Sequence, residues 1–504
     1  MILPVELQTL DASDQRVDVP LCVDLDGTLV KSDTLHDALM VMMRQSPVSI
    51  LKAFGWLRQG KAAFKRHVTS VVMLDAAHLP YNHALLQFLR EEKARGRKIY
   101  LATAAEKALA DRVADHLGIF DGVLASEGKI NLAGKNKLAA FEQMFPGGFC
   151  YIGNALPDAK LLAVCQTPMV ANPHGKLKVA MKRAGTVPTR VFEDKKPPIK
   201  AFFKAIRIHQ WAKNVLIFLP LLLAHQIRWN TLAGAAVAFL SFGLCASATY
   251  IINDLLDLEV DRRHPRKRFR PFAAADLSVG AGLAIVATFF ALSVLLGLAL
   301  PYIFTAVPGH SSLPSPHKFL LWLGIYTIMT LSYSFRLKKM VLVDAIVLSM
   351  LYTLRIIVGS VATGVPVTTW LAAFSIFFFL SLAFAKRFAE LENLRAREKE
   401  TAAGRGYRVG DLEQLRTFGA ASGYAAVVVL ALYLNSLAAQ NLYPHITRLW
   451  LLIPIIILWV SRLWMVASRG ELDEDPVVYA LEDKNSLVIG LVMLLVIASA
   501  IIRF

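Results

Sequence analysis

The second half of the chain consists of apolar segments long enough to cross a lipid bilayer, and this feature limits the fold more than any other. A membrane-spanning helix needs about 20 mostly apolar residues. About nine such segments follow Trp211, at roughly 215–231, 233–252, 277–300, 318–335, 341–363, 367–385, 417–437, 447–467 and 485–503. The sequence therefore predicts an all-α integral membrane domain at residues 205–504.

Charge falls in alternate loops between these segments. Most charged residues lie at 253–275, 335–340, 386–416 and 468–484. Since basic loops stay in the cytoplasm, we expect an inner-membrane protein whose N-terminal region and active-site face are cytoplasmic. No cleaved signal peptide is expected, because the N-terminus lacks a basic stretch followed by an apolar one. Only 18% of residues are charged, which excludes a wholly soluble protein. The net charge is +17, and we expect the basic residues to contact lipid headgroups and phosphates. We expect no nucleic acid as a partner.

Residues 1–190 have the pattern of a separate soluble domain, so the chain is multidomain. Short apolar runs alternate with helical stretches, which predicts a doubly wound α/β sheet. The predicted strands are 19–25, 99–103, 122–125, 150–153 and 169–171. Residues 34–95 form a small helical insertion, and residues 191–204, rich in Lys and Pro, form a linker to the membrane domain.

Two acids follow the first predicted strand, in the segment LCVDLDGTLV. Asp24 and Asp26 are separated by one residue, and the turn after them exposes backbone N–H groups to an anion. One carboxylate can attack a phosphoryl group while the other protonates the leaving oxygen. The pair also supplies the oxygen ligands that Mg²⁺ prefers.

Later residues add to this predicted site. Thr103 offers a hydroxyl to a phosphate, and Lys137, with Lys135 as the alternative, can neutralise charge in the transition state. This set resembles the haloacid-dehalogenase-like (HAD-like) phosphohydrolase superfamily. The resemblance implies that Asp24 is the nucleophile, Asp26 the acid/base and Asp158 a metal-site acid, so that all three would contact Mg²⁺.

One position departs from that family. Asn154 stands where an aspartate is usual, and an amide supplies an oxygen without a charge. A retained fold with weak or no hydrolysis is therefore the alternative interpretation of this domain.

A second acidic motif ends the second apolar segment. Asn253, Asp257 and Asp261 are spaced by four, which predicts that they share one helical face, with Asp254 off that face. Acids at the end of an apolar helix normally face a cavity, and three oxygen ligands suit Mg²⁺ bound to a diphosphate. Basic residues that follow can contact phosphate; they are Arg262, Lys267, Arg268 and Arg270.

This motif resembles the first signature of the UbiA superfamily of intramembrane prenyltransferases. Such enzymes typically carry a second acidic motif after the sixth span, and both motifs bind metal. Here that position reads AKRFAEL, in which Glu390 is the predicted metal ligand and the basic pair Lys386 and Arg387 precedes it. The site for an isoprenyl diphosphate is therefore altered.

Several further segments are similar to decaprenyl-phosphate phosphoribosyltransferases, among them RIHQWAKN at 207–214 and the basic run after Asp261. This resemblance implies transfer of 5-phosphoribosyl from phosphoribosyl diphosphate to a polyprenyl phosphate in the bilayer, with Mg²⁺ as cofactor. The HAD-like domain would then remove the 5-phosphate of the product. Predicted phosphate contacts outside the first motif are Lys213, Lys338, Lys339, Lys386 and Arg387.

Two other functions remain as alternatives. An aromatic prenyltransferase would use an isoprenyl diphosphate, which the basic pair at 386–387 disfavours. A transporter with a regulatory head would need polar residues at mid-span, whereas the charged clusters lie on one side. Four further polar residues are either members of the site or structural: Tyr333, Asp344, Arg355 and Asp483. Of these, Asp344 and Arg355 are a candidate ion pair. His209 and Trp211 are expected to be interfacial anchors, and the sequence leaves homo-oligomerisation open.

Overall fold

The computed structural model describes residues 19–46, 48–58, 60–127, 132–304, 315–396, 405–472 and 476–501. The chain divides into two compact units. The first contains Met1–Ile206 and Tyr250–Ile285, and the second contains Arg207–Thr249 and Val286–Phe504. Each unit is described separately.

The first unit is built on a six-stranded parallel sheet with the order β3-β2-β1-β4-β5-β6. The strands are β1 (Leu21–Val23), β2 (Ile99–Glu106), β3 (Gly122–Ser126), β4 (Cys150–Gly153), β5 (Thr167–Ala171) and β6 (Arg190–Phe192). The predicted parallel α/β domain is confirmed, and β6 is a strand that the sequence pattern did not predict. The strand order reverses between β1 and β4, and this reversal decides where a ligand can bind.

Both faces of this sheet are buried, which explains the continuous apolar runs of its strands. Alternate residues of β1 enter different cores: Leu21 and Val23 pack on one face, and Cys22 packs on the other beside Tyr151. The four cysteines are free and buried, as expected for thiols used as small apolar side chains.

Helices cover the sheet and connect its strands. They are α1 (Thr34–Gln45), α2 (Ser49–Arg58), α3 (Lys61–Val71), η1 (Ala76–His78), α4 (His83–Ala94), α5 (Lys107–Leu117), α6 (Lys135–Met144), η2 (Leu156–Asp158), α7 (Ala159–Val164), α8 (Gly175–Ala184) and α9 (Pro198–Ile206). The predicted helical insertion corresponds to α1–α4, between β1 and β2. Asp33 begins it as the N-cap of α1, because its carboxylate accepts the N–H groups of Leu35 and His36. The first unit also contains two short elements from its stretch Tyr250–Ile285: α12 (Leu258–Arg263) and η4 (Lys267–Phe269).

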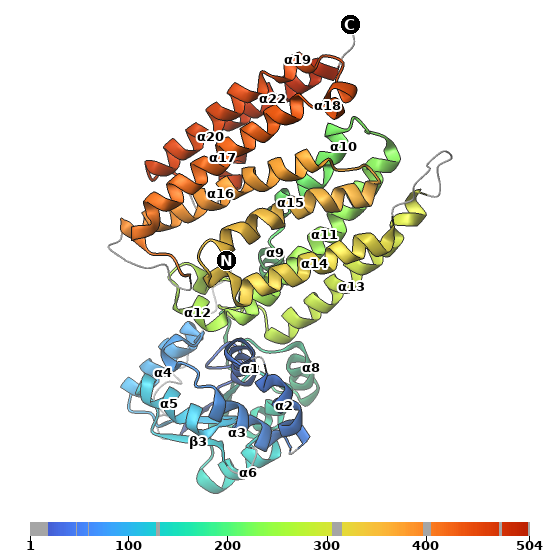
Figure 1. Cartoon of the computed structure of the whole chain (residues 1–504). Helices are drawn as coiled ribbons and strands as arrows, with labels where there is room; N and C mark the ends of the chain where they lie inside the picture. Colours follow the sequence, from blue (N-terminus) through green and yellow to red (C-terminus); the bar gives the residue numbers. More distant parts are fainter. Residues whose placement is uncertain are drawn as a thin grey trace, which may run out of the picture. The chain divides into compact units, whose positions relative to one another are not determined.

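The second unit is all-helical, and its long helices lie side by side (Figure 1). They are α11 (Trp229–Leu256), α13 (Val279–Phe304), α14 (Pro316–Phe335), α15 (Val343–Thr363), α16 (Thr369–Arg395), α17 (Leu412–Leu434), α20 (Leu452–Ser468) and α22 (Lys484–Ile501), with parts of α11 and α13 in the first unit. The short elements are η3 (Ile208–Phe218), α10 (Leu219–Leu223), η5 (Leu337–Lys339), η6 (Val409–Asp411), α18 (Leu437–Leu442), α19 (Ile446–Leu449) and α21 (Pro476–Glu482).

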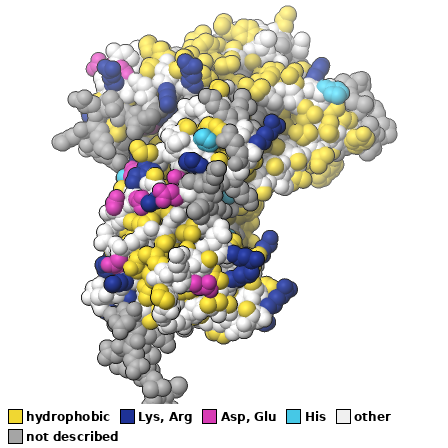
Figure 2. All heavy atoms as spheres, turned by 90° about the horizontal axis from the view of Figure 1, so that it is seen from below, with side chains coloured by type: hydrophobic (Ala, Val, Ile, Leu, Met, Phe, Trp, Pro, Cys, Tyr) yellow, Lys and Arg dark blue, Asp and Glu magenta, His cyan; other side chains and the backbone are white. Residues whose placement is uncertain are grey.

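Seven helices in the described residues are long and apolar enough to cross a membrane. The chain is therefore an integral membrane protein, while the predicted total of about nine spans is not confirmed. The predicted span at 318–335 corresponds to α14, which is not among the seven. Hydrophobic side chains make up much of the outer surface in Figure 2. The exposed apolar residues of this unit include Leu295, Val428 and Leu495, as expected of a surface that faces lipid.

The first predicted span, 215–231, is wrong as a single helix. This stretch contains the end of η3 and the short α10, which ends at Leu223. Pro220 lies in the first turn of α10, where its missing N–H is tolerated. The helical path stops after Leu223, where His225 has a φ of +55°, and α11 begins only at Trp229. Gly359 of α15 lets η3 approach closely, since a Cβ there would lie 2.1 Å from the carbonyl oxygen of Ile217.

Candidate active sites

Asp24 and Asp26 follow β1 at the point where the strand order reverses. In a doubly wound sheet, this point is a crevice at the carboxyl ends of the strands, where ligands bind. Asp24 is buried, and Asp26 accepts a hydrogen bond from the backbone N–H of Thr34 (2.8 Å). Gly27 has a φ of +75°, so the turn after the two acids requires a residue without a Cβ.

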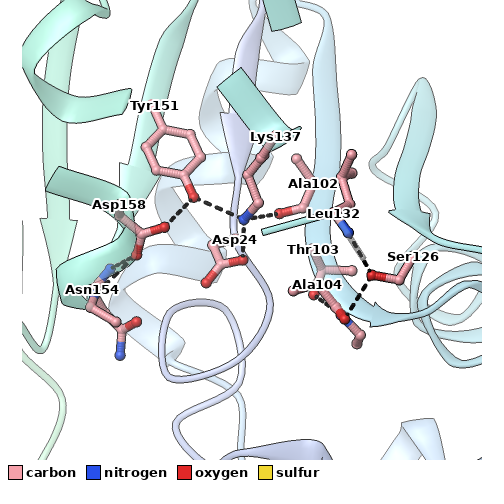
Figure 3. A network of polar contacts seen from close by, with 12 residues as sticks. Asp24, Ala102, Thr103, Ala104, Ser126, Leu132, Lys137, Tyr151, Asn154 and Asp158 are labelled. Atoms are coloured by element: carbon pink, nitrogen blue, oxygen red, sulfur yellow. Dashed lines mark hydrogen bonds and ion pairs between the residues drawn. The ribbon is translucent and has the colours of Figure 1, made fainter. Parts of the chain in front are cut away.

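Lys137 of α6 lies at the centre of a buried polar network (Figure 3). Its Nζ donates to Oδ1 of Asp24 (2.8 Å), to the carbonyl oxygen of Ala102 (3.1 Å) and to the hydroxyl of Tyr151 (3.1 Å). Tyr151 donates in turn to Asp158 (2.8 Å). The network therefore links the ends of β1 and β4 through one ammonium group, with Tyr151 as a member that the sequence analysis missed.

Asn154 and Asp158 follow β4. The Oδ2 of Asp158 accepts the backbone N–H groups of Asn154 (3.1 Å) and Ala155 (3.0 Å), which fixes this carboxylate on the loop. The Oδ1 of Asn154 is buried and has no hydrogen-bond partner among the described residues, so it is an oxygen available to a cation. A Cβ on Gly27 would lie 2.0 Å from Nδ2 of Asn154, so this close approach also depends on glycine.

Two further residues were predicted for this site. Thr103 is fully buried, and its hydroxyl accepts the N–H of Ala105 (3.0 Å). Lys135, the alternative to Lys137, is exposed at the start of α6. The structure thus favours Lys137 as the lysine of the site.

Burial controls the protonation of these groups. It raises the pKa of Asp24 to about 6 against the opposing effect of Lys137. It also raises the pKa of Asp26 to about 7, with the charge of Asp33 acting in the same direction. Burial disfavours the charge of Lys137, but Asp24 and Asp158 outweigh it and raise the pKa of the ammonium group. The site therefore combines a charged lysine with two acids that hold protons more readily than usual.

The acidic motif at residues 253–261, which we call the first motif, crosses a break between two helices. α11 ends just before Asp257, which is the N-cap residue of α12. Asp254 and Asp261 are buried and both accept from Nη1 of Arg270, at 3.1 and 2.7 Å. Asp257 accepts from Nη1 of Arg44 of α1 at 2.5 Å, a contact within the first unit.

This arrangement differs from the predicted face of Asn253, Asp257 and Asp261. Asp254 and Asp261 share the guanidinium of Arg270 across the break at Asp257, so Asp254 lies with the other acids and is not off the face. Burial raises the pKa of Asp261 to about 6 even though Arg270 pulls it down. Burial therefore outweighs the arginine and makes Asp261 hold a proton more readily than usual.

The basic residues of this motif divide into two groups. Arg262 is buried and pairs with Asp37 (2.8 Å) while donating to the carbonyl oxygen of Ala273 (3.1 Å), so these contacts hold α12 within the first unit. Lys267 and Arg268 are exposed. Of the predicted phosphate contacts here, these two are the most accessible.

A second polar cluster lies in the second unit, and we call it the arginine cluster; its members are Tyr333, Asp344, Arg387, Glu390 and Arg405. Arg387 is 1% exposed and donates to Asp344 (2.6 Å), Glu390 (2.6 Å) and the hydroxyl of Tyr333 (2.9 Å). Arg405 donates to the other oxygen of Glu390 (3.0 Å) and to Tyr333 (3.2 Å). Arg405 was not predicted, because it lies far from the other members in the sequence and belongs to no motif.

The remaining predicted residues are spread over the second unit. Asp344 and Arg355 do not pair with each other: Arg355 donates to Asn214 (3.0 Å) and lies over the ring of Tyr352, as does Lys213. Asp483 pairs with Arg462 (2.6 Å), which lowers its pKa to about 2 despite the opposing effect of desolvation. Trp211 donates to Ser247 (2.9 Å). Lys338 and Lys386 are half-buried, Lys339 is exposed and His209 is exposed on η3.

Two places in the chain carry acids that could bind Mg²⁺: the site after β1 in the first unit, which we call the head, and the first motif at residues 253–261. Within the described ranges, no group of three or more His, Cys, Asp or Glu side chains is arranged to hold a metal ion. Mg²⁺ usually takes one or two carboxylates and completes its shell with water and substrate phosphates. Asp24 and Asp26 with the unpartnered Oδ1 of Asn154 fit that pattern. The first motif also supplies the one or two carboxylates that the pattern requires, from Asp257 and Asp261.

Comparisons with known proteins identify relatives of this chain. "Uncharacterized protein y4nM" of Sinorhizobium fredii is 38% identical over 489 residues, which are 95% of this chain and 90% of that protein. "Nodulation protein NoeC" of Azorhizobium caulinodans is 34% identical over 60% of this chain and 95% of its own length. A decaprenyl-phosphate phosphoribosyltransferase of Corynebacterium glutamicum is 36% identical over 212 residues, which are 40% of this chain and 60% of that enzyme.

The family model described as "UbiA prenyltransferase family" matches residues 214–481, which include both the acidic motif at the end of α11 and the arginine cluster. This match extends over more than half of the chain. The chain therefore belongs to the UbiA prenyltransferase family.

Proposed function

We propose that this protein transfers 5-phosphoribosyl from phosphoribosyl diphosphate to a polyprenyl phosphate in the membrane. In this reaction, the bond between the anomeric carbon and the diphosphate breaks, and an oxygen of the acceptor phosphate bonds to that carbon. The acceptor is already an anion, so the reaction needs no general base. It does need cations at the leaving diphosphate, at the separate 5-phosphate and at the acceptor.

The observation that carries the proposal is the arginine chemistry of residues 386–390. Where the family's second acidic motif is expected, Arg387 is bonded to both Asp344 and Glu390. A substrate with an additional phosphate benefits from guanidinium groups, because they bind phosphate oxygens through charge-assisted hydrogen bonds. The similarity to a protein named decaprenyl-phosphate phosphoribosyltransferase supports the same substrates.

Asp257, Asp261 and Asn253 would hold Mg²⁺ at the first motif. When bound, the ion would neutralise charge on the leaving diphosphate. The protein's own contribution is electrostatic: Arg270 holds Asp254 and Asp261 in place, and the exposed Lys267 and Arg268 attract the anionic substrate.

The acceptor chain needs an apolar space, and the second unit contains one. A cavity of about 490 Å³ is lined almost entirely by apolar side chains of α10, α16, α17, α20 and α22. Its wall on α22 extends from Ser486 to Ile497, a distance of about 16 Å along the helix at 1.5 Å per residue. We propose that several isoprene units of the polyprenyl chain occupy it.

For the first unit, we propose a HAD-like phosphatase that removes the 5-phosphate of the product. Asp24 would attack phosphorus to form an aspartyl phosphate, and Asp26 would protonate the departing 5-hydroxyl. Water would then hydrolyse the acyl phosphate. Lys137 supports this chemistry, because its ammonium lies 2.8 Å from the attacking carboxylate and would offset the charge that builds on the phosphoryl group.

The transferase proposal is tested with full-length protein in nanodiscs that contain polyprenyl phosphate. Labelled phosphoribosyl diphosphate is supplied in one reaction, and an isoprenyl diphosphate with an aromatic acid in the other. We expect labelled lipid only in the first reaction, and little of it with Asp257→Ala. Alkylation of the aromatic acid, without ribosyl-lipid, would instead assign the protein to the prenyl-transferring members of its family.

The phosphatase proposal is read from the mass of the lipid product. We expect wild-type protein to release ribosyl-lipid without the 5-phosphate, and Asp24→Asn to accumulate the phosphorylated form. If both proteins leave the 5-phosphate in place, the head does not act on this product.

We further propose that the head and the polar clusters face the cytoplasm. Cysteine labelling of Lys267→Cys from each side of inverted vesicles would test this orientation.

A further inference from the structure

The acids of the arginine cluster do not fit a metal ion. Both oxygens of Glu390 accept hydrogen bonds from arginines, and both oxygens of Asp344 accept as well, from Arg387 and from the hydroxyl of Tyr407 (2.5 Å). Two carboxylates and two guanidinium groups already balance in charge. A divalent cation would have to displace arginine from at least one acid and would then lie next to two positive groups.

The two arginines have different surroundings. The side chain of Arg387 is 2% exposed and its three nitrogens are all bonded to members of the cluster, so its role is to position them. The side chain of Arg405 is 22% exposed. Its Nε and Nη1 are bonded, but its Nη2 makes no hydrogen bond within the part of the chain that the structure describes. Arg405 therefore presents open donors from a fixed guanidinium plane.

The segment that carries Arg405 is docked firmly. A Cβ on Gly406 would lie 2.6 Å from the carbonyl oxygen of Lys339, so the two backbones touch. The hydroxyl of Tyr407 accepts the N–H of Leu342 (2.9 Å) while it donates to Asp344. These contacts pack the backbone next to Arg405 against the segment that carries Lys338 and Lys339, two further basic residues of this unit. A preorganised, partly exposed guanidinium with open donors is suited to a phosphate.

We infer that the arginine cluster is a phosphate site without a metal ion, in which Arg405 binds a substrate phosphate directly and Arg387, Glu390 and Tyr333 position it. The inference rests on the proposed phosphoryl substrates and refines them. The ligand is a phosphate monoester dianion, supplied either by the 5-phosphate of phosphoribosyl diphosphate or by the headgroup of the polyprenyl phosphate. Metal binding by the transferase is then confined to the first motif.

The first experiment counts metal ions and does not depend on turnover. Full-length protein in nanodiscs is titrated with Mn²⁺ in the presence of inorganic pyrophosphate, and bound Mn²⁺ is measured by electron paramagnetic resonance. All proteins carry Asp24→Asn to weaken the head site equally. We expect Glu390→Gln to bind as much Mn²⁺ as its parent, and Asp257→Asn to weaken binding at least tenfold. Loss of a bound Mn²⁺ in Glu390→Gln would overturn the inference.

The second experiment measures KM for each substrate in Arg405→Gln. Arg395→Gln is the matched control, because Arg395 is an exposed arginine at the end of α16 that pairs with Glu392 one turn away. We expect the KM of one substrate to rise at least tenfold in Arg405→Gln and to stay unchanged in the control. An increase for phosphoribosyl diphosphate identifies the 5-phosphate, and an increase for polyprenyl phosphate identifies the headgroup.

Arg405→Lys separates binding from folding. It keeps the charge but cannot bond Glu390 and Tyr333 with one planar group, so we expect an intermediate KM. If both KM values in Arg405→Gln equal those of the control, Arg405 does not bind substrate and the inference fails. If wild-type protein uses neither substrate, the proposed function fails, while the Mn²⁺ titration still decides whether this cluster holds metal.

Discussion

Replacing Lys137 with methionine tests the buried network of the head. The ammonium lies 2.8 Å from Asp24, and its side chain is 3% exposed. At an effective dielectric constant of about 20, two charges at this distance attract by about 6 kcal/mol. Breaking one partner of a buried pair costs about 3–5 kcal/mol in practice. Asp24 can take up a proton when its partner is gone, so we expect the lower end, about 3 kcal/mol.

The assay is pulse proteolysis of the full chain in urea, scored by the intact head. With a slope of about 2 kcal/mol per M, a loss of 3 kcal/mol lowers the urea midpoint by about 1.5 M. The measurement is made near pH 8. The pKa of Lys137 is raised in the folded protein, so the lysine is fully charged below its ordinary value of 10.5. The ion pair loses its stabilising effect only when the pH rises through the folded pKa.

Two variants control this experiment. Lys135→Met removes an exposed lysine from the same helix and should leave the midpoint unchanged. Lys137→Met combined with Asp24→Asn removes the stranded carboxylate and should regain about half of the loss, since the two residues are coupled. A midpoint that falls by less than about 0.5 M in Lys137→Met, or that is no higher in the double variant, would refute the reasoning.

Three further substitutions follow from the structure. Asp257→Ala should lower ribosyl-lipid formation at least 100-fold at unchanged protein yield, because it removes a central carboxylate of the first motif; mass spectrometry of the lipid would show equal product if Asp257 has no such role. Asn154→Asp adds a charge at the unpartnered Oδ1 and should lower the Mg²⁺ concentration for half-maximal phosphate release about tenfold, whereas an unchanged value would place the cation elsewhere. Gly359→Ala forces a Cβ to within 2.1 Å of the backbone of Ile217 and should destabilise the second unit by at least about 1–3 kcal/mol, measured as aggregation temperature, while Gly324→Ala on α14 meets nothing within 4 Å and should be neutral or slightly stabilising.

Elements with a strong local pattern were predictable. The five predicted strands were recognised because each is an apolar run between turns, and Asp24 could be placed at a sheet edge because it follows one. β6 was missed because two of its three residues are exposed and it lacks an apolar pattern. The first membrane span was predicted too simply, since hydropathy alone does not show that α10 ends at Leu223 and α11 begins only at Trp229.

Sites that depend on distant contacts were less predictable. Asp254 was placed off the acidic face because a strict spacing of four was assumed, whereas the residue actually shares Arg270 with Asp261. Arg405 is separated from Glu390 by 15 residues and lies in no recognisable pattern, so only its contacts reveal it. A sequence can indicate which acids are candidate ligands, but it cannot show which of them are already occupied by arginines.

The eleven residues of η3 determine how far the chain extends at the start of the second unit. A 3₁₀-helix rises about 2.0 Å per residue against about 1.5 Å in an α-helix. This segment therefore reaches about 22 Å, roughly 5 Å farther than the same residues would as an α-helix. A rewinding into α form would shorten this segment and turn the ring of Trp211 and the carboxamide of Asn214 to new directions. The hydrogen bonds of Trp211 to Ser247 and of Asn214 to Arg355 therefore depend on η3 staying tightly wound.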